Sequence, residues 1–467
     1  MTTSLFDFPS REPVIDRRKF LVKSAGGLAA GGLASHSWPA ALAAEEKANA
    51  IHGPISITDI EVHEITLEYH DYLAYQLNHY YGPNRRTVYI VHTNKEGLIG
   101  LGESNGRATP DTINHYIGTN PFEHIGDETS LGLGTAMYDL MGKAAGVPVY
   151  KLFGQRFRRW VPVGSWTVSC APRLMAETVQ RYAARGFTWM KFHLSPFENV
   201  LDQLDAMQKV APKGFKILFD ITMGGTNDHT PKLLDDIGKF PIAGAFEDPF
   251  FERDLDAYVE LRARSPLPIF LHHSPLSATF EVLRRAADGY ILGHSNLGRT
   301  MRRAGLFAAA NLPFMCQNVG GQITRSMTTH MQAAFKTGTL SFHADTETWK
   351  SDVVNEWVDP TNGLLRVSET PGLGVTLNRS ELERLARLEL PEHPKWIIKT
   401  RYDNGTLMYN IADPKESIFM VRPDGRRLLP MSYAAPLKTD WWDDDGSAEY
   451  KEMFQRIERD GVVMVKP

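Results

Sequence analysis

The stretch that decides the fold runs from Trp189 to His273, where four short apolar runs each end at a residue able to bind a metal or move a proton. In order they are Trp189-Met190-Lys191-Phe192-His193, Ile217-Leu218-Phe219-Asp220, Ala245-Phe246-Glu247-Asp248-Pro249 and Ile269-Phe270-Leu271-His272-His273. Runs this short and bulky are typical of strands buried on both faces. Because helical patterns separate them, these polar ends are expected to meet at the carboxyl ends of parallel strands, where barrel enzymes hold their active sites.

Strand and helix patterns alternate beyond this stretch in both directions. The predicted strands are 161–169, 190–194, 216–222, 245–249, 268–273, 290–294, 313–319 and 340–343. This alternation predicts an α/β fold, a modified (β/α)8 TIM-like barrel. An open doubly wound sheet is the alternative, but it usually carries a Gly-rich phosphate loop after its first strand, and the sequence has none there.

Other segments flank the barrel, as expected for a chain of 467 residues. Three strand patterns and a helix predict an α+β capping domain over 57–150, and the barrel domain is placed at 160–392. The remainder, 393–467, is a C-terminal extension with short hairpin-like runs, one of them turning at 422–425, and a helix over 449–458.

The first 43 residues resemble a twin-arginine signal peptide. Arg17 and Arg18 precede a mildly apolar Gly/Ala-rich stretch that ends at Ala41-Leu42-Ala43, and a polar linker follows over 44–56. We therefore expect export by the twin-arginine translocase to the periplasm or another extracytoplasmic space; a disordered basic arm is the alternative. The segment is too short and Gly-rich for a membrane span, and no cysteine comes directly after the cleavage site to carry a lipid, so no membrane anchor is expected.

The composition is that of a soluble globular protein, with 42% hydrophobic and 23% charged residues. A net charge of -4 argues against a nucleic-acid partner, which would require a basic face. A secreted protein stapled by disulfides would carry more than two cysteines, so Cys170 and Cys316 are expected to be buried thiols.

Asp220 and Glu247 end consecutive predicted strands, and two converging carboxylates suit Mg²⁺ or Mn²⁺. A metal-free acid/base pair and helix N-caps are the alternatives. His272 and His273 end the next strand, and only one of them can face the barrel mouth because neighbouring strand residues point to opposite faces. An imidazole ligand would shift the preference toward Mn²⁺, Fe²⁺ or Zn²⁺.

Further polar side chains are predicted around the same mouth. Lys191 and His193 share a strand face, and a histidine is suited to taking a proton near neutral pH. The last three strands end at His294, Gln317, Asn318 and His343. Tyr72, Tyr75 and His79 lie in a segment interpreted as a loop, which indicates a lid or a sugar-contacting surface, or else a locally packed loop.

In this order the chain resembles the enolase superfamily, in the mandelate racemase/muconate lactonizing enzyme branch. The resemblance covers about residues 57–377 and rests on a capping domain, the lysine strand, Asp220, Glu247-Asp248-Pro249 and the closing Pro371-Gly372-Leu373-Gly374. It implies a bound Mg²⁺ that holds a substrate carboxylate while a base removes the α-proton, and a homo-oligomeric assembly. The metal would stabilise the enediolate that results.

The resemblance assigns Asp220 and Glu247 as metal ligands and Lys191 as the first lysine of a Lys-x-Lys motif. Three positions depart from it. His193 stands in place of the second lysine, which is usually the base. His272 or His273, with His272 favoured by position, replaces the third acidic ligand. Gln317-Asn318 stands where racemase-like members carry a catalytic histidine.

These departures favour a lyase, because a racemase needs a proton handler on each face of the carbon. We expect an exported metal-dependent dehydratase of a hydroxylated carboxylate, with a sugar acid as substrate. The expected catalytic residues are Lys191, His193, His294 and His343: His193 as the base, Lys191 to orient the substrate carboxylate, and His294 or His343 as the acid. The expected metal ligands are Asp220, Glu247 and His272, and the expected substrate-binding residues are Tyr72, Tyr75, His79, His273, Gln317 and Asn318. The alternatives are a racemase, epimerase or other sugar-active enzyme on the same fold, and a non-catalytic sugar-binding protein.

Overall fold

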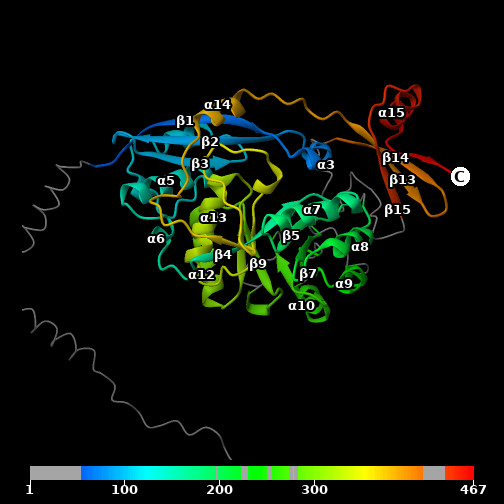
Figure 1. The fold of residues 1–467 in the computed structure, drawn as a ribbon, viewed down its shortest axis with the longest axis horizontal. Coiled ribbons are helices and arrows are strands. Elements are labelled where there is room, and N and C mark those ends of the chain that lie inside the picture. Colours follow the sequence, from blue (N-terminus) through cyan, green and yellow to red (C-terminus); the bar gives the residue numbers. More distant parts are fainter. Residues whose placement is uncertain are drawn as a thin grey trace, which may run out of the picture. The chain divides into compact units, whose positions relative to one another are not determined.

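The computed structural model describes residues 54–195, 198–221, 230–249, 255–272, 277, 282–413 and 437–467. The predicted signal peptide, most of the linker, His273 and the turn at 422–425 lie outside these residues. Ser56–Pro467 forms one compact unit. Figure 1 shows its three parts, which are a capping domain, a barrel and a C-terminal sheet.

The capping domain is built on an antiparallel meander of β1 (Ile57–Leu67), β2 (Asn84–Thr93) and β3 (Ile99–Ser104). Helix α5 (Leu131–Ala144) covers it and is almost wholly buried. Glycine is required where they meet, because a Cβ at Gly102 would lie 2.1 Å from the carbonyl oxygen of Gly132. The smaller helices are α4 (Pro110–Asn114), η2 (Pro121–His124) and α6 (Tyr150–Phe153).

One expectation for this domain is wrong. The segment interpreted as a loop is helix α3 (Asp71–Tyr81). Its buried residues Leu73, Leu77 and Tyr80 recur at helical spacing. The side chains of this segment therefore have the fixed directions of a helix.

Eight parallel strands form the barrel, in the order of the sequence. They are β4 (Trp160–Thr167), β5 (Trp189–His193), β6 (Lys216–Asp220), β7 (Ala243–Glu247), β8 (Ile269–Leu271), β9 (Gly289–Gly293), β10 (Phe314–Gln317) and β11 (Phe342–His343). Pairing of β11 with β4 closes the sheet, which confirms the barrel over the open doubly wound alternative. The helices between the strands include α7 (Pro172–Ala184), α8 (Val200–Val210), α9 (Thr230–Gly238), α10 (Leu255–Arg264), α12 (Leu297–Ala309) and α13 (Gln322–Ala334).

The strand register places the polar strand ends beside one another. His193 of β5 pairs with Asp220 of β6, and Asp220 in turn pairs with Glu247 of β7. The apolar residues before these ends, such as Phe192, Phe219 and Phe246, are fully buried. Polar groups therefore gather at the carboxyl-terminal edge, as the sequence pattern predicts.

After the barrel the chain returns to the capping domain. It passes through η3 (Thr346–Thr348) and β12 (Leu364–Arg366), which pairs antiparallel with β4, and then α14 (Arg379–Arg387). Helix α14 packs on β1, where Arg379 Nη1 lies 2.7 Å from Glu61 Oε2. The last part of the predicted barrel domain thus packs against the cap.

The C-terminal extension forms a separate antiparallel sheet. Its strands are β13 (Trp396–Tyr402), β14 (Leu407–Ala412), β15 (Leu437–Trp442) and β16 (Val463–Val465), in the order β15-β13-β14-β16. Helix α15 (Ala448–Asp460) packs on this sheet around a small core of its own, formed by Ile397, Tyr409, Tyr450, Ile457 and Val463.

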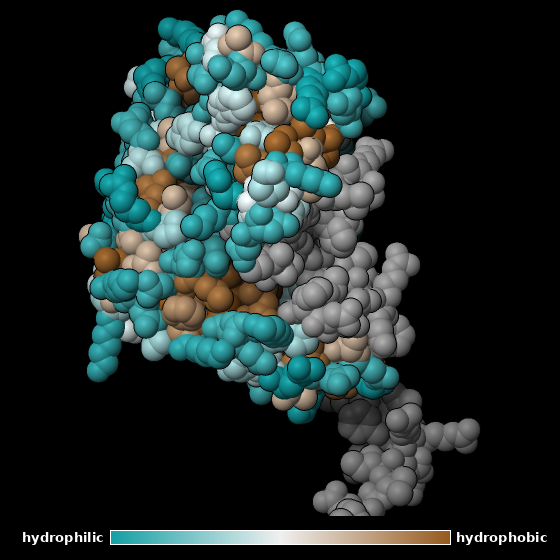
Figure 2. Space-filling model, turned by 90° about the vertical axis from the view of Figure 1, so that its right-hand side faces the viewer, coloured by the Kyte–Doolittle hydropathy of each residue, from teal (hydrophilic) through white to brown (hydrophobic). Residues whose placement is uncertain are grey.

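The coloured part of the face in Figure 2 is mostly hydrophilic, with hydrophobic residues gathered in a few patches, one of them below the centre. Among the helices that the structure describes, none is long and apolar enough to cross a membrane. Cys170 and Cys316 are free and buried, which confirms the expectation for both thiols.

Candidate active site

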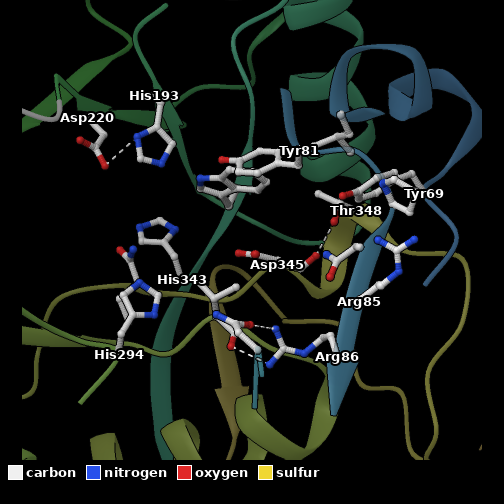
Figure 3. A pocket seen from close by; sticks show the side chains of 17 residues that line it. Tyr69, Tyr81, Arg85, Arg86, His193, Asp220, His294, His343, Asp345 and Thr348 are labelled. Atoms are coloured by element: carbon white, nitrogen blue, oxygen red, sulfur yellow. Dashed lines mark hydrogen bonds and ion pairs between the residues drawn. The ribbon is translucent and has the colours of Figure 1, made fainter. Parts of the chain in front are cut away.

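A cavity of about 400 Å³ lies between the capping domain and the carboxyl-terminal ends of the barrel strands. Figure 3 shows that side chains from both domains point into it. The barrel contributes Trp166, His193, Asp220, His294, Gln317, Val319 and His343, and the segment after it contributes Asp345 and Thr348. The capping domain contributes Tyr69, Leu77, Tyr81, Pro83, Asn84, Arg85, Arg86 and Asn105.

Lys191 lies beneath this cavity and is fully buried. Its Nζ is 2.9 Å from Asp220 Oδ2, 2.8 Å from Glu247 Oε1 and 2.8 Å from Gln317 Oε1. Burial acts to lower the pKa of Lys191, but the two carboxylates outweigh it and hold the pKa above its ordinary value. An ammonium has three donors, and all three have acceptors here. Among the described residues, those that line the cavity do not include Lys191. The expected role of orienting a substrate carboxylate therefore does not fit, and Lys191 instead positions the two acids.

His193 and Asp220 form a pair on the cavity wall. His193 Nδ1 lies 3.1 Å from Asp220 Oδ2, and the His193 side chain is 15% exposed. Trp166 meets the imidazole edge-on, with ring centroids 6.1 Å apart. Donation from Nδ1 to the carboxylate fixes the ring orientation and the tautomer, so that Nε2 is the basic nitrogen. Asp220 thus engages one ring nitrogen of His193 and leaves the other as the site for a proton.

Three side chains near Glu247 could hold a cation. One ligand atom each from Glu247, Asp248 and His272 lies within 4.8 Å of the other two. His272 Nδ1 is 3.1 Å from Glu247 Oε1, and the His272 backbone N–H donates to Asp248 Oδ1 over 2.8 Å. Glu247 Oε2 is buried and has no hydrogen-bond partner among the described residues. An orphaned carboxylate oxygen beside an imidazole and a second acid fits a divalent cation.

Charge balance around Lys191 favours the same conclusion. Asp220, Glu247 and Asp248 are buried with one ammonium between them, which leaves two negative charges in excess when all three acids are ionised. Burial, and next the charge of Asp220, raise the pKa of Glu247 well above its ordinary value. A divalent cation would neutralise the excess and keep Glu247 ionised. Asp220, expected as a ligand, stands outside the three-residue group and is held by Lys191 and His193.

The two remaining histidines of the mouth differ from each other. His294 lines the cavity in a left-handed conformation (φ 51°), and its ring stacks on that of His272 at 5.8 Å. His343 is buried, and its Nδ1 lies 3.0 Å from the Ser165 carbonyl oxygen, to which it donates. Burial, and next the charge of Lys191, lower the pKa of His343 to about 3. A neutral ring whose N–H is engaged by a carbonyl is not a general acid near neutral pH, so the expectation of that role for His343 is not supported.

The expected substrate-binding residues separate into two groups. Gln317 lines the cavity, whereas Asn318 is buried and donates to Thr328 Oγ1 over 3.1 Å. Tyr72 packs against the Arg181 guanidinium at 4.3 Å, outside the cavity wall. Tyr75 and His79 contact Asp443 of the C-terminal extension instead. None of these four side chains, Asn318, Tyr72, Tyr75 and His79, is placed where it would support the expected contact with substrate.

Sequence reasoning missed several cavity residues from the cap and from the segment after the barrel. Asp345 lies centrally in Figure 3, and its pKa is raised to about 6 by burial, against the opposing charges of Arg86 and Lys191. Arg86 is buried, pairs with Glu103 and Asn105, and donates to the Val319 carbonyl over 3.0 Å. Asp345 follows a strand of only two residues, and Arg86 sits within β2, so neither shows a strand-end signal.

Acids and histidines thus lie at successive strand ends of a parallel barrel that a capping domain covers. This arrangement is typical of barrel enzymes, which hold their active sites at that edge. Residues 174–381 match the enolase C-terminal domain-like family. An N-succinyl-L-Arg/Lys racemase from Bacillus cereus is 24% identical over 344 residues, 64% of this chain and 90% of that protein. An arabinonate dehydratase from Saccharolobus solfataricus is 22% identical over 263 residues, 54% of this chain and 70% of that protein.

Solved structures agree with the sequence relatives. An enolase from Pseudomonas fluorescens, crystallised with magnesium, potassium and tartrate, is similar with a TM-score of 0.60 at 18% identity, covering 71% of this chain and 92% of that one. The chain belongs to the enolase superfamily, in its mandelate racemase/muconate lactonizing enzyme-like branch. Its relatives support an enzyme of this superfamily that acts on a small molecule.

Proposed function

We propose that the protein is a metal-dependent lyase that removes the α-proton and then the β-hydroxyl of a hydroxylated carboxylate, with a sugar acid as substrate. The observation that carries the proposal is the cavity of about 400 Å³ in which the His193–Asp220 pair faces polar groups of the cap, beside the buried acids around Glu247. A cavity of this size and polarity suits a small hydroxylated ligand.

His193 is the proposed base. Asp220 accepts its Nδ1–H, and this contact holds the ring while Nε2 takes the proton from the substrate. Asp220 also stabilises the imidazolium that forms, and Lys191 Nζ lies 2.9 Å from the same carboxylate. The base thus depends on a buried network of charged groups rather than on one side chain.

Glu247, His272 and Asp248 are the residues that would hold a divalent ion, with Asp220 next to them. When bound, the ion would supply electrophilic stabilisation of the negative charge that develops on the substrate carboxylate. The imidazole ligand keeps Mn²⁺, Fe²⁺ and Zn²⁺ open beside Mg²⁺. A relative that was crystallised with magnesium supports a divalent site in this fold.

His294 is the proposed acid for the departing hydroxyl, with Asp345 as the second candidate. Both line the cavity, and the raised pKa of Asp345, about 6, keeps a fraction of that carboxyl protonated near neutral pH. Arg86, from the cap, lines the cavity as well, and its guanidinium is held there by Glu103 and by the Val319 carbonyl. Cap and barrel thus supply different parts of the reaction.

A racemase or epimerase is the second candidate function. It is favoured by the similarity to the N-succinyl-L-Arg/Lys racemase over 90% of that protein. It requires a second proton handler opposite His193. Lys191 is fully buried with its three donors engaged, so it would have to leave all three partners to reach the substrate. A non-catalytic sugar-binding protein remains the third candidate.

The proposal includes export in a folded state by the twin-arginine route and assembly as a homo-oligomer. The Arg17-Arg18 pair and the Ala41-Leu42-Ala43 site support export, since this route suits a protein that acquires its metal before translocation.

Turnover of a substrate library tests the proposal. Protein starting near Ala44 is assayed against sugar acids and related carbohydrates with Mg²⁺ or Mn²⁺, and Glu247→Gln serves as the blank. We expect formation of a 2-keto acid that chelator abolishes and added metal restores. A product that keeps all its oxygen atoms but inverts at Cα identifies the racemase. Tight sugar binding without any turnover identifies the non-catalytic alternative.

A further inference from the structure

A second cluster of side chains that could bind a metal ion lies outside the barrel, where helix α3 meets the C-terminal extension. Ring nitrogens of His79 and His393 and a carboxylate oxygen of Asp443 lie within 4.8 Å of one another. The three come from α3, the segment before β13 and the turn after β15. His79 lies far from the other two residues in the sequence, so only the folded chain brings the three side chains together.

The hydrogen bonds within the cluster determine which nitrogens remain basic. His79 Nδ1 donates to the Tyr75 carbonyl over 2.6 Å, and His393 Nδ1 donates to the Pro394 carbonyl over 2.7 Å. A carbonyl oxygen can only accept, so each Nδ1 carries a proton and each Nε2 is the lone-pair nitrogen of a neutral ring. His79 Nε2 therefore faces Asp443 Oδ1 at 2.8 Å, which places two acceptors against each other.

A cation resolves this contact. A proton on His79 would do so, but it would leave the second imidazole unexplained. The His393 ring lies 3.8 Å from that of His79, centroid to centroid. A metal ion uses both rings and the carboxylate at once.

The groups behind the three side chains match those of a metal site. Both imidazoles donate their second N–H to a backbone carbonyl, and the Tyr75 hydroxyl donates to Asp443 Oδ2 over 2.7 Å. Such contacts orient ligands and fix histidine tautomers in metalloproteins. Trp441 stacks on His79 at 4.8 Å, and Trp396 meets both histidines edge-on, so the rings have little freedom.

Access differs among the three residues. The His79 side chain is fully buried, whereas that of Asp443 is 41% exposed, so an ion could enter from the solvent side. Two imidazoles and one carboxylate suit Zn²⁺ or a similar transition-metal ion better than Mg²⁺ or Ca²⁺, which prefer oxygen ligands. Three protein ligands would leave at least one position for water.

We propose that His79, His393 and Asp443 form a binding site for a transition-metal ion of the Zn²⁺ type, separate from the barrel site, which fastens the C-terminal extension to helix α3. Tyr81, at the end of the same helix, lines the central cavity. The bound ion would therefore also hold one wall of that cavity. This site does not depend on the reaction proposed for the barrel.

Zinc titration of the chelator-treated protein tests the site. The barrel site is first weakened with Glu247→Gln, and His393→Gln or Asp443→Asn is then added to that background. Asp444→Asn is the matched control, because it makes the same change one residue away, and an asparagine keeps the oxygen that accepts the Gly446 N–H over 2.9 Å. Circular dichroism checks that each variant is folded.

We expect one zinc equivalent in the Glu247→Gln background and in the Asp444→Asn control. Its affinity should fall by more than about tenfold in each ligand variant, since even loss of an outer contact costs about 10–100-fold. Zinc should also raise the melting temperature of the control but not of the ligand variants. Equal zinc affinity in His393→Gln, Asp443→Asn and the control would overturn the site, as would the absence of any zinc equivalent in the Glu247→Gln background.

Discussion

Replacement of Lys191 by methionine should expose how strongly the barrel site depends on one buried ammonium. The change removes three charge-assisted hydrogen bonds, at 2.9 Å to Asp220, 2.8 Å to Glu247 and 2.8 Å to Gln317, the first two of which are also ion pairs. Bonds of this kind contribute about 1.5–3 kcal/mol each. Removing one partner of a buried ion pair costs about 3–5 kcal/mol. We therefore expect the free energy of unfolding of the metal-free protein to fall by about 3–5 kcal/mol.

The loss should depend on pH and on metal. The folded-state pKa of Glu247 is raised above its unfolded value, so its contribution to stability is lost as pH rises through the folded pKa. Without the ammonium that opposes this shift, Lys191→Met should be far less stable than wild type in mildly alkaline buffer and closer to it in acid, where Glu247 binds a proton. A divalent ion should restore part of the loss, because it replaces the missing positive charge.

The assay is urea unfolding followed by circular dichroism, with and without Mg²⁺ or Mn²⁺ after chelator treatment. Lys209→Met is the matched control, since Lys209 is 70% exposed and pairs with Asp205 on the surface; its loss should stay below about 1 kcal/mol. A loss for Lys191→Met below about 1 kcal/mol, or one that is the same in acid and alkaline buffer, would refute the role assigned to the ammonium.

Three further predictions concern other parts of the chain. A Cβ at Gly293 would lie 2.1 Å from His272 Nε2, so Gly293→Ala should displace that imidazole. We expect the free energy of unfolding to fall by about 1–3 kcal/mol and Mn²⁺ binding, measured by calorimetry, to weaken. Unchanged Mn²⁺ binding would contradict the assignment of His272 as a ligand. Asp345→Asn should match wild type in acid and be more stable by up to about 3 kcal/mol above about pH 6, because a raised pKa of about 6 costs stability once the half-buried carboxyl ionises. Urea unfolding at both pH values checks this, and equal stability throughout would refute it. Replacing Arg17 and Arg18 by lysine should leave the precursor in the cytoplasm, as seen by cell fractionation; undiminished export would contradict the twin-arginine route.

The barrel could be predicted from sequence because buried parallel strands carry a local signal. Bulky apolar runs ending at His193, Asp220 and Glu247 indicate both the strands and the edge where their ends meet. The capping helix α3 carried a usable signal as well, since Leu73, Leu77 and Tyr80 recur at helical spacing. The density of Tyr and His obscured that periodicity.

The partners of each polar side chain could not be predicted in the same way. Lys191 and Gln317 are on different strands, and only the closed barrel shows that Gln317 Oε1 accepts a hydrogen bond from the Lys191 ammonium. Burial raises the pKa of Asp345, which shares its cavity with Arg86, a residue far away in the sequence. His79 and Asp443 meet only because the C-terminal extension folds back on the cap. Contacts between distant segments depend on tertiary packing, which local patterns do not encode.

Loss of the α-proton signal of a sugar acid in D2O, followed by proton NMR with metal present, tests most directly whether His193 is the base. We predict that wild type and a surface variant, His63→Gln, remove the signal at equal rates, and that His193→Gln slows the loss by about 10²–10⁴-fold while metal binding and the melting temperature stay near those of wild type. A His193→Gln rate within about tenfold of wild type, for an acid that wild type turns over, would contradict the central claim.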